Sequence, residues 1–192
     1  MQKRHRFRLA FPYLLIAGGA LLAFQGARDL VEARLGQYDA AREFSASAKP
    51  RVVQPAIYRP QAGDTVAKLS IPRLNTELYV VEGTDTADLR RGPGHLTGTA
   101  MPGEAGNCVI AGHRDTHFRI LREIRPGDSV ILERDERHFI YRVKRVQVVS
   151  PTNVTALQPS SNTLHLITCY PFSYIGAAPK RMVVEAQLTA SS

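Results

Sequence analysis

Beyond residue 63 the chain alternates short runs of apolar and β-branched residues with Gly, Pro, Asn and Asp. This spacing is typical of a sandwich or a barrel made of short strands. We expect an all-β barrel, because closure of the sheet removes exposed strand edges. Helical periodicity is weak, with short possibilities at Asp85–Arg90 and Phe118–Ile124. The eight expected strands are Thr65–Ile71, Leu78–Glu82, Asn107–Gly112, Ser129–Glu133, His138–Lys144, Arg145–Val149, Thr163–Cys169 and Arg181–Leu188.

Two of these strands follow each other directly, and their alternating patterns are out of phase. Phe139, Tyr141 and Val143 share one face of the first, whereas Val146 and Val148 in the second have the opposite parity. Since side chains in a strand alternate strictly between two faces, this change of phase predicts a bulge or a bend.

The N-terminus has a different pattern. Residues 1–8 contain four basic side chains and no acidic one, and the sixteen residues from Leu9 to Phe24 carry no charge. A helix that spans a bilayer needs about 20 apolar residues, which an extension of the run to Ala27 would supply. A cleaved signal peptide has the same layout, but no suitable small-residue cleavage site follows the run directly. We therefore expect a transmembrane anchor over residues 9–27, with residues 1–8 cytoplasmic and the rest outside the cell membrane.

Residues 28–62 connect this segment to the predicted barrel. Between Arg28 and Lys49 four acidic residues balance four basic ones, and the apolar positions have loosely helical spacing, which indicates a stalk helix. The stretch Ser45–Gln61 contains three prolines and predicts an extended linker. The folded domain should therefore occupy residues 63–192.

Net charge adds little to this picture. The 192 residues carry a formal charge of +8, from 25 basic and 17 acidic side chains. From Arg51 onward, however, 17 basic residues face 13 acidic ones, and no basic stripe is interleaved with aromatic residues. We expect no nucleic-acid partner.

Candidate chemistry lies where predicted strands end. Cys169 closes an apolar strand two residues before Pro171, so its thiol should sit beside a loop. A thiol with a pKa near ~8.5 needs a histidine or a positive charge to act as a nucleophile at neutral pH. His113 also follows a strand, and Arg181 begins the last one. Each of these residues, taken alone, has an ordinary structural explanation as well.

Several segments together resemble the sortases, the membrane-anchored cysteine transpeptidases of bacterial surfaces, and most closely those of class D. The resemblance extends from about residue 66 to residue 188, and the joint occurrence of its motifs in this order is highly specific. The matching segments are GPGH at 92–95, PGEAGN at 102–107, IAGHR at 110–114 and TLHLITC at 163–169, with Arg181 twelve positions beyond the last.

The resemblance implies an eight-stranded sortase barrel in which Cys169, His113 and Arg181 are catalytic. In sortases the cysteine attacks the carbonyl after the threonine of an LPxTG-like signal at the C-terminus of a secreted protein. The acyl group then passes to an amine acceptor, such as a peptidoglycan precursor or a pilin lysine. His113 would act as acid and base, and Arg181 would stabilise the oxyanion.

The resemblance also indicates residues that bind substrate. These are Thr168, within the TLHLITC motif, and Tyr170 and Pro171 just after it, together with His95, which could instead be a turn residue. We expect no cofactor and no metal. Specificity should depend on the loops that flank the site, because such loops vary on a rigid scaffold.

Other interpretations of the same residues stay open at this stage. Cys108 is most simply a small buried residue, but a Cys108–Cys169 disulfide would make the domain a non-catalytic surface module. A zinc site at His113 and His117 is disfavoured, since the segment HRDTH lacks the glutamate of an HExxH hydrolase. A thiol peptidase that uses water as the acceptor is the main enzymatic alternative.

Overall fold

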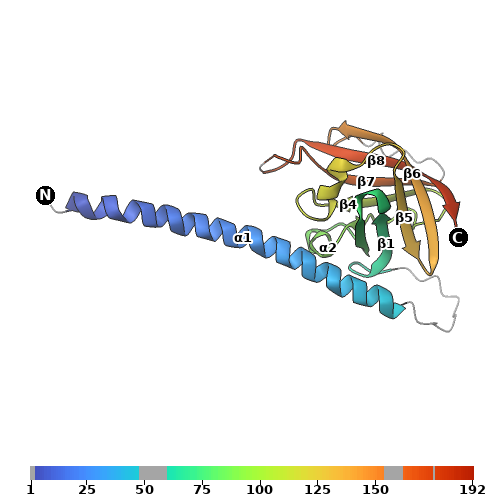
Figure 1. The fold of residues 1–192 in the computed structure, drawn as a ribbon, viewed down its shortest axis with the longest axis horizontal. Helices are drawn as coiled ribbons and strands as arrows, with labels where there is room; N and C mark the ends of the chain where they lie inside the picture. Colours follow the sequence, from blue (N-terminus) through green and yellow to red (C-terminus); the bar gives the residue numbers. More distant parts are fainter. Residues whose placement is uncertain (1–2, 48–59, 154–161, 175) are drawn as a thin grey trace.

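The computed structural model describes residues 3–47, 60–153, 162–174 and 176–192. Two parts are evident: a long helix, α1 (Lys3–Ser47), and a β-barrel against which the second half of that helix lies (Figure 1). Within the described ranges, three short helices accompany the barrel, namely α2 (Thr86–Arg91) and the 3₁₀ helices η1 (Pro72–Leu74) and η2 (His117–Glu123).

The barrel is closed by eight strands in the order β1-β2-β3-β4-β7-β8-β6-β5. Most neighbours are antiparallel, whereas β2 with β3 and β4 with β7 are parallel pairs. The strands are β1 (Thr65–Ile71), β2 (Thr76–Glu82), β3 (Gly94–His95), β4 (Asn107–Gly112), β5 (Ser129–Arg134), β6 (Arg137–Val149), β7 (Thr163–Tyr170) and β8 (Lys180–Ser191).

The predicted eight-stranded barrel is confirmed, but its strands divide differently. The two strands expected over residues 138–149 form one strand, β6, and the predicted irregularity is a shift in its pairing with β8 between Val143 and Arg145. The eighth strand is instead β3, which has two residues and is too short to produce an alternating pattern. Helices α2 and η2 lie at the two positions where short helices were expected.

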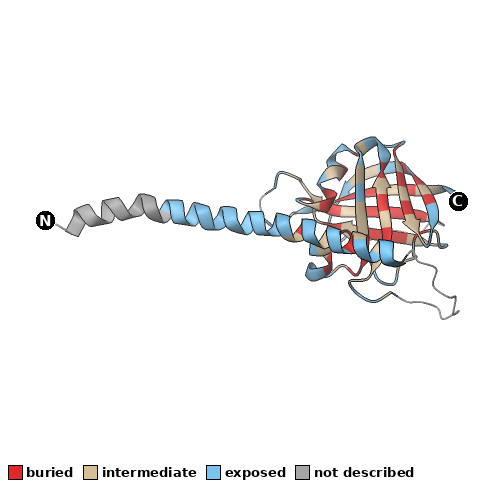
Figure 2. Ribbon diagram, turned by 60° about the horizontal axis from the view of Figure 1, so that its bottom comes forward, coloured by how far each residue is buried: buried red, intermediate tan, exposed pale blue. Residues whose placement is uncertain are grey.

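The interior is a continuous apolar core, and the buried residues that recur along the strands are red in Figure 2. Its largest side chains include Tyr141, Leu69 and Ile110, and Phe118 of η2 closes it from the end of β4. A Cβ on Gly112 would lie 2.7 Å from the Phe118 ring. Only glycine fits there without displacing the ring, so this packing fixes the chain immediately before residue 113.

Helix α1 docks on the barrel through its second half. Ala33 and Ala40 are buried, and a Cβ on Gly36 would lie 2.5 Å from the Arg91 Cα atom, so the two backbones are in close contact. The Gln37 side chain accepts a hydrogen bond from the Tyr79 amide at 2.7 Å and donates to the carbonyl oxygens of Tyr79 and Arg91.

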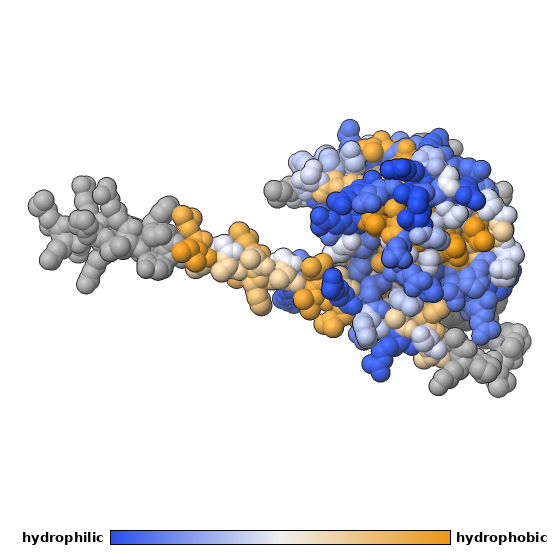
Figure 3. Space-filling view, viewed as in Figure 1, coloured by the Kyte–Doolittle hydropathy of each residue, from blue (hydrophilic) through white to orange (hydrophobic). Residues whose placement is uncertain are grey.

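The first half of α1 extends away from the barrel (Figure 1). Its described apolar side chains, such as Leu22 and Phe24, are exposed, and Figure 3 shows hydrophobic residues along this part of the helix. Among the described residues, no helix has a stretch both long and apolar enough to cross a membrane. The transmembrane helix expected over residues 9–27 is therefore not confirmed.

The expected stalk and linker are only partly described. The stalk region belongs to α1, which continues through Ser45 to Ser47. Most of the proposed linker, residues 48–59, lies outside the described residues.

Candidate active site

The strand order brings the predicted site residues to one rim of the barrel. Strands β4 and β7 are parallel, and β8 is antiparallel to β7, so the ends of β4 and β7 meet the beginning of β8. Cys169 and Arg181 are directly paired across β7 and β8, which places their Cβ atoms about 5 Å apart on one face. Gly112 pairs with Thr168 across β4 and β7, so His113 follows beside Cys169.

A cavity of about 280 Å³ opens at this rim. Cys169, His113 and Arg181 all line it, so residues 56 and 12 positions from the cysteine in sequence share one surface. The other lining residues are Arg114, Asp115, Gly176, Ala177 and Ala178.

The two cysteines have opposite environments. Cys169 is half-buried at the cavity, whereas Cys108 is 2% exposed on β4, where burial raises the pKa of its thiol to about 12. Both thiols are free. The interpretation of Cys108 as a small buried residue is confirmed, and the alternative of a Cys108–Cys169 disulfide is wrong.

Arg181 is already oriented at the cavity wall. Its Nη1 donates to the carbonyl oxygens of Ala178 at 3.1 Å and Lys180 at 3.0 Å, both in the segment that leads into β8. These contacts employ one of the guanidinium nitrogens. No described residue accepts from its other N–H donors, and the fork geometry of the group allows them to contact an oxygen that develops negative charge.

His113 lies near a second histidine, His117. His117 is buried, and its Nε2 lies 3.4 Å from the Arg90 carbonyl oxygen of α2. Burial is the main cause that lowers the pKa of His117, the Arg90 carbonyl opposes it, and His113 lowers it further. Within the described part of the chain, no cluster of three His, Cys, Asp or Glu residues could hold a metal ion.

The residues on either side of Cys169 make contacts that hold the end of β7 in place. Thr168 is buried, and its hydroxyl donates to the Gly112 carbonyl oxygen at 2.7 Å, tying the end of β7 to the end of β4. The Tyr170 ring packs edge-on against Phe172, with centroids 6.1 Å apart. Of the predicted substrate-binding residues, Thr168, Tyr170 and Pro171 therefore adjoin the cavity without appearing among the side chains that line it.

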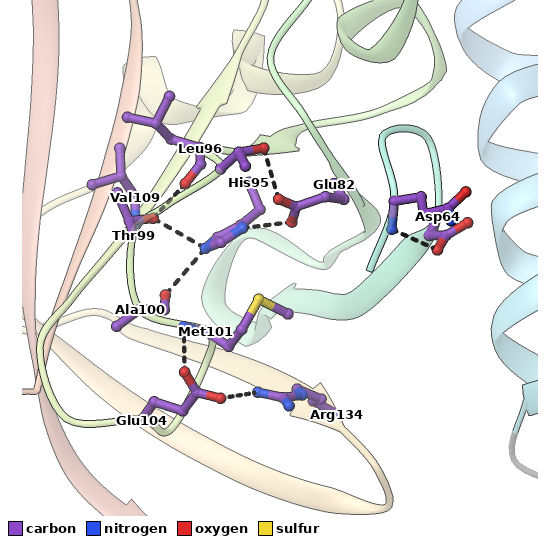
Figure 4. Close-up of polar contacts among 12 residues, drawn as sticks. Asp64, Glu82, His95, Leu96, Thr99, Ala100, Met101, Glu104, Val109 and Arg134 are labelled. Carbon is purple, nitrogen blue, oxygen red and sulfur yellow. Dashed lines mark hydrogen bonds and ion pairs between the residues drawn. The ribbon is translucent and has the colours of Figure 1, made fainter. Parts of the chain in front are cut away.

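His95 lies elsewhere, in the closed polar cluster of Figure 4. It is 2% exposed, its Nδ1 lies 2.7 Å from a Glu82 carboxylate oxygen, and its Nε2 faces the Thr99 hydroxyl and the Ala100 carbonyl oxygen. A ring whose two nitrogens are both engaged, at a buried position away from the cavity, has no surface to offer a substrate. His95 thus lies in the short strand β3 rather than in the turn that the sequence also allowed.

Sequence reasoning missed Arg114. This side chain is 7% exposed, lines the cavity, and donates to three carbonyl oxygens of the segment between β7 and β8. Its position directly after His113 was visible in the sequence, but the acceptors lie 57 to 62 residues away. No local pattern reports contacts of that range.

Comparison with known proteins gives consistent matches. The sequence model of the sortase domain family matches residues 69–189. Sortase D of Bacillus subtilis is 34% identical over 187 residues, which cover 90% of this chain and 94% of the relative. The structure of a Clostridium perfringens sortase D5 transpeptidase superposes with a TM-score of 0.71 and 26% identity, covering 81% of this chain and 99% of the other. A catalytic domain of a Bacillus anthracis sortase (SrtD) gives a TM-score of 0.60 at 33% identity, over 73% and 98% of the two chains.

Proposed function

The chain belongs to the sortase family of cysteine transpeptidases, and from this premise we propose that it cleaves an LPxTG-like sorting signal after threonine and transfers the acyl group to an amine. The observation that supports this most strongly is the shared cavity of Cys169, His113 and Arg181. A nucleophile, an acid–base group and a fixed cation are the three components that acyl transfer through a thioester requires.

In the first half-reaction the Cys169 Sγ attacks the threonine carbonyl carbon as a thiolate, with its proton held by His113, and a C–S bond forms. The carbonyl oxygen becomes an oxyanion, which Arg181 stabilises with the N–H donors not engaged with Ala178 and Lys180. The C–N bond then breaks, and the His113 imidazolium donates its proton to the leaving amine. The products are a thioacyl enzyme and the released C-terminal peptide.

In the second half-reaction an amine attacks the thioester carbonyl. His113, now neutral, accepts a proton from the incoming nitrogen, and the C–S bond breaks to restore the Cys169 thiolate. The acceptor would be a peptidoglycan precursor or the lysine of a pilin, and the donor a secreted protein with a C-terminal sorting signal. Such substrates place the reaction outside the cytoplasm, at the cell surface.

The backbone and rings beside Cys169 would complete the substrate groove. Thr168 holds the end of β7 against Gly112, and the Tyr170–Phe172 pair stands at the start of the following segment. We assign Thr168 a positioning role and Tyr170 and Pro171 the wall next to the threonine of the signal.

Hydrolysis is the competing reaction of the same thioester. A thiol peptidase would release the acyl group to water at a rate that does not depend on amine concentration. The two outcomes are separated by mass spectrometry of a sorting peptide incubated with increasing concentrations of an amine: transpeptidation predicts an amide product that increases at the expense of the free acid.

The experiment that tests the assignment compares cysteine variants in that assay. Cys169→Ala should abolish both cleavage and transfer with little change in the melting temperature, since the side chain is half-buried at a rim. Cys108→Ala is the matched control and should retain activity. His113→Ala and Arg181→Ala should each lower kcat/KM by about 10²–10⁴-fold in a folded protein. Near-normal rates in any of these three site variants would refute the corresponding role.

A further inference from the structure

Arg114 is a buried cation that the proposed chemistry does not use. Its Nη1 donates to the Pro171 carbonyl oxygen at 3.0 Å, and its Nη2 donates to those of Tyr174 and Gly176 at 2.6 and 2.9 Å. The Nε atom lies 3.4 Å from a carboxylate oxygen of Asp115, which is itself exposed. Four acceptors therefore surround one guanidinium.

This arrangement requires the following segment to adopt one shape. Three carbonyl oxygens spread over residues 171–176 converge on two nitrogens of a planar group, which is possible only when the chain curves around it. Burial of a charge is costly unless the charge is fully hydrogen-bonded, and bonds from a charged donor are stronger than neutral ones. The side chain of Arg114 is thus a template around which the start of the β7–β8 connection folds.

The same segment forms a wall of the cavity. Gly176, Ala177 and Ala178 line the same cavity as Cys169, and the Ala178 carbonyl oxygen accepts a hydrogen bond from Arg181. Gly176 is both a lining residue and an acceptor for Arg114. The position of this wall therefore depends on a side chain that follows His113 directly.

We propose that Arg114 is a positioning residue that holds residues 171–174 and 176–178 in the conformation that binds the donor peptide, before that peptide arrives. The inference rests on the proposed function for its substrate. Arg114 acts on binding through the wall, so its loss should raise KM much more than it lowers kcat, because the chemistry of Cys169 and His113 is left in place.

Two variants separate this role from a simple need for positive charge. Arg114→Gln keeps a polar side chain but removes the charge and most donors, and Arg114→Lys keeps the charge on a single nitrogen that cannot span three carbonyls. Arg119→Gln is the matched control, since Arg119 is exposed on η2, five positions along the chain. Peptide cleavage gives KM and kcat, and hydrogen exchange measured by mass spectrometry reports on the amides of residues 172–178.

We expect exchange in that segment to accelerate at least about tenfold in Arg114→Gln, with unchanged exchange in β4 and β7. KM for the sorting peptide should rise about tenfold or more, with kcat within about threefold of normal. Arg114→Lys should give an intermediate result, and Arg119→Gln should match the original protein in both measurements.

The proposal is overturned if segment exchange does not change, if Arg114→Lys restores KM completely, or if kcat falls while KM stays constant. Unfolding of both variants would also overturn it, because Arg114 would then be a residue of the fold as a whole. The exchange measurement needs no substrate. If the original protein cleaved no sorting peptide, the proposed function would fail while the positioning role could still be read from exchange.

Discussion

At the scale of single residues, the two cysteines have the same side chain but differ in burial, which leaves one thiol accessible and makes the other inert. Cys108 is enclosed in the wall of the barrel, and its pKa is raised to about 12, mainly by burial. Cys169 stands at the rim beside a histidine and an arginine. Because the thiolate is the reactive form, the surroundings of a cysteine rather than its identity determine its chemistry.

This contrast predicts selective alkylation. In the native protein at pH 8, iodoacetamide should add one group, on Cys169, whereas after denaturation it should add two. Mass analysis of the intact chain and of its peptides measures both the number and the site. Equal rates at the two cysteines of the folded protein would show that Cys108 is not enclosed as described.

The same scale shows what the sequence could and could not predict at the site. The sequence could indicate Cys169, His113 and Arg181, because each lies at or next to the end of an apolar strand and belongs to a recognisable motif. Arg114 was not, because its partners depend on how the 171–176 segment curves. The surroundings of His95 could not be predicted for a similar reason: the sequence places it after Pro-Gly, typical of a turn, but its burial in β3 depends on Glu82 from another strand.

At the scale of elements, the barrel was predictable where alternation persists for five or more residues. β3 was missed because its two residues lie against β2 and β4 through pairings that only the tertiary fold creates. The sequence pattern divided β6 into two strands, because a bulge within one strand and a turn between two strands produce the same change of phase in the alternation of apolar residues. The registers between β4, β7 and β8, which align the site, are likewise a property of the sheet rather than of any one strand.

The docking of α1 predicts opposite effects of one substitution at two glycines of the same helix. Gly26→Ala meets no atom within 4 Å, so it should stabilise the helix by about 0.5–1 kcal/mol. At Gly36 the added methyl group would lie 2.5 Å from the Arg91 Cα atom, and the helix must shift away. Thermal unfolding should show a lower melting temperature for Gly36→Ala and an equal or higher one for Gly26→Ala. A common direction for both would contradict the docking geometry.

A second element-level prediction concerns acid stability. Arg73 on η1 forms a two-bond ion pair with Asp128, at 2.5 and 2.8 Å, and the Arg125 amide also donates to that carboxylate. The Arg73 hydrogen bond is the main cause that lowers the pKa of Asp128 below its usual 3.8, against the effect of burial. A carboxylate with a lowered pKa stabilises the folded state above its unfolded pKa and loses that contribution as pH falls through the folded value.

Arg73→Gln should therefore lower the melting temperature at pH 7, and the difference from the original protein should shrink as the pH falls below about 4. Arg122→Gln provides the control. Its ion pair with Glu123, at 3.3 Å, is half-exposed on both sides, and such pairs contribute little. A difference for Arg73→Gln that stays constant from pH 7 to pH 3 would mean that the ion pair is not its cause.

At the scale of the whole molecule, α1 covers part of β2 beside the short strand β3. β3 pairs with β2 only at Val81 and Glu82. The backbone N–H and C=O groups of Tyr79, two residues earlier in β2, are therefore not paired with β3. The Gln37 amide occupies both the N–H and the C=O of Tyr79, much as a neighbouring strand would. The helix thus covers a short exposed edge, a feature that proteins otherwise protect against association.

Truncation tests this division between stability and chemistry. Removal of residues 1–30 leaves the docking contacts of Ala33, Gln37 and Ala40 intact and should change neither the melting temperature nor kcat/KM. Removal of residues 1–59 exposes the Tyr79 edge, so we expect a loss on the order of 2 kcal/mol, or about 4–8 °C in melting temperature. Below the melting temperature of the truncated protein, kcat/KM should stay within about threefold of normal, because the ends of β4, β7 and β8 are held by the barrel itself. A large fall in kcat/KM without a change in melting temperature would show instead that α1 acts on the cavity. The contact between the Arg90 carbonyl oxygen of α2 and His117 would then connect the helix to the site.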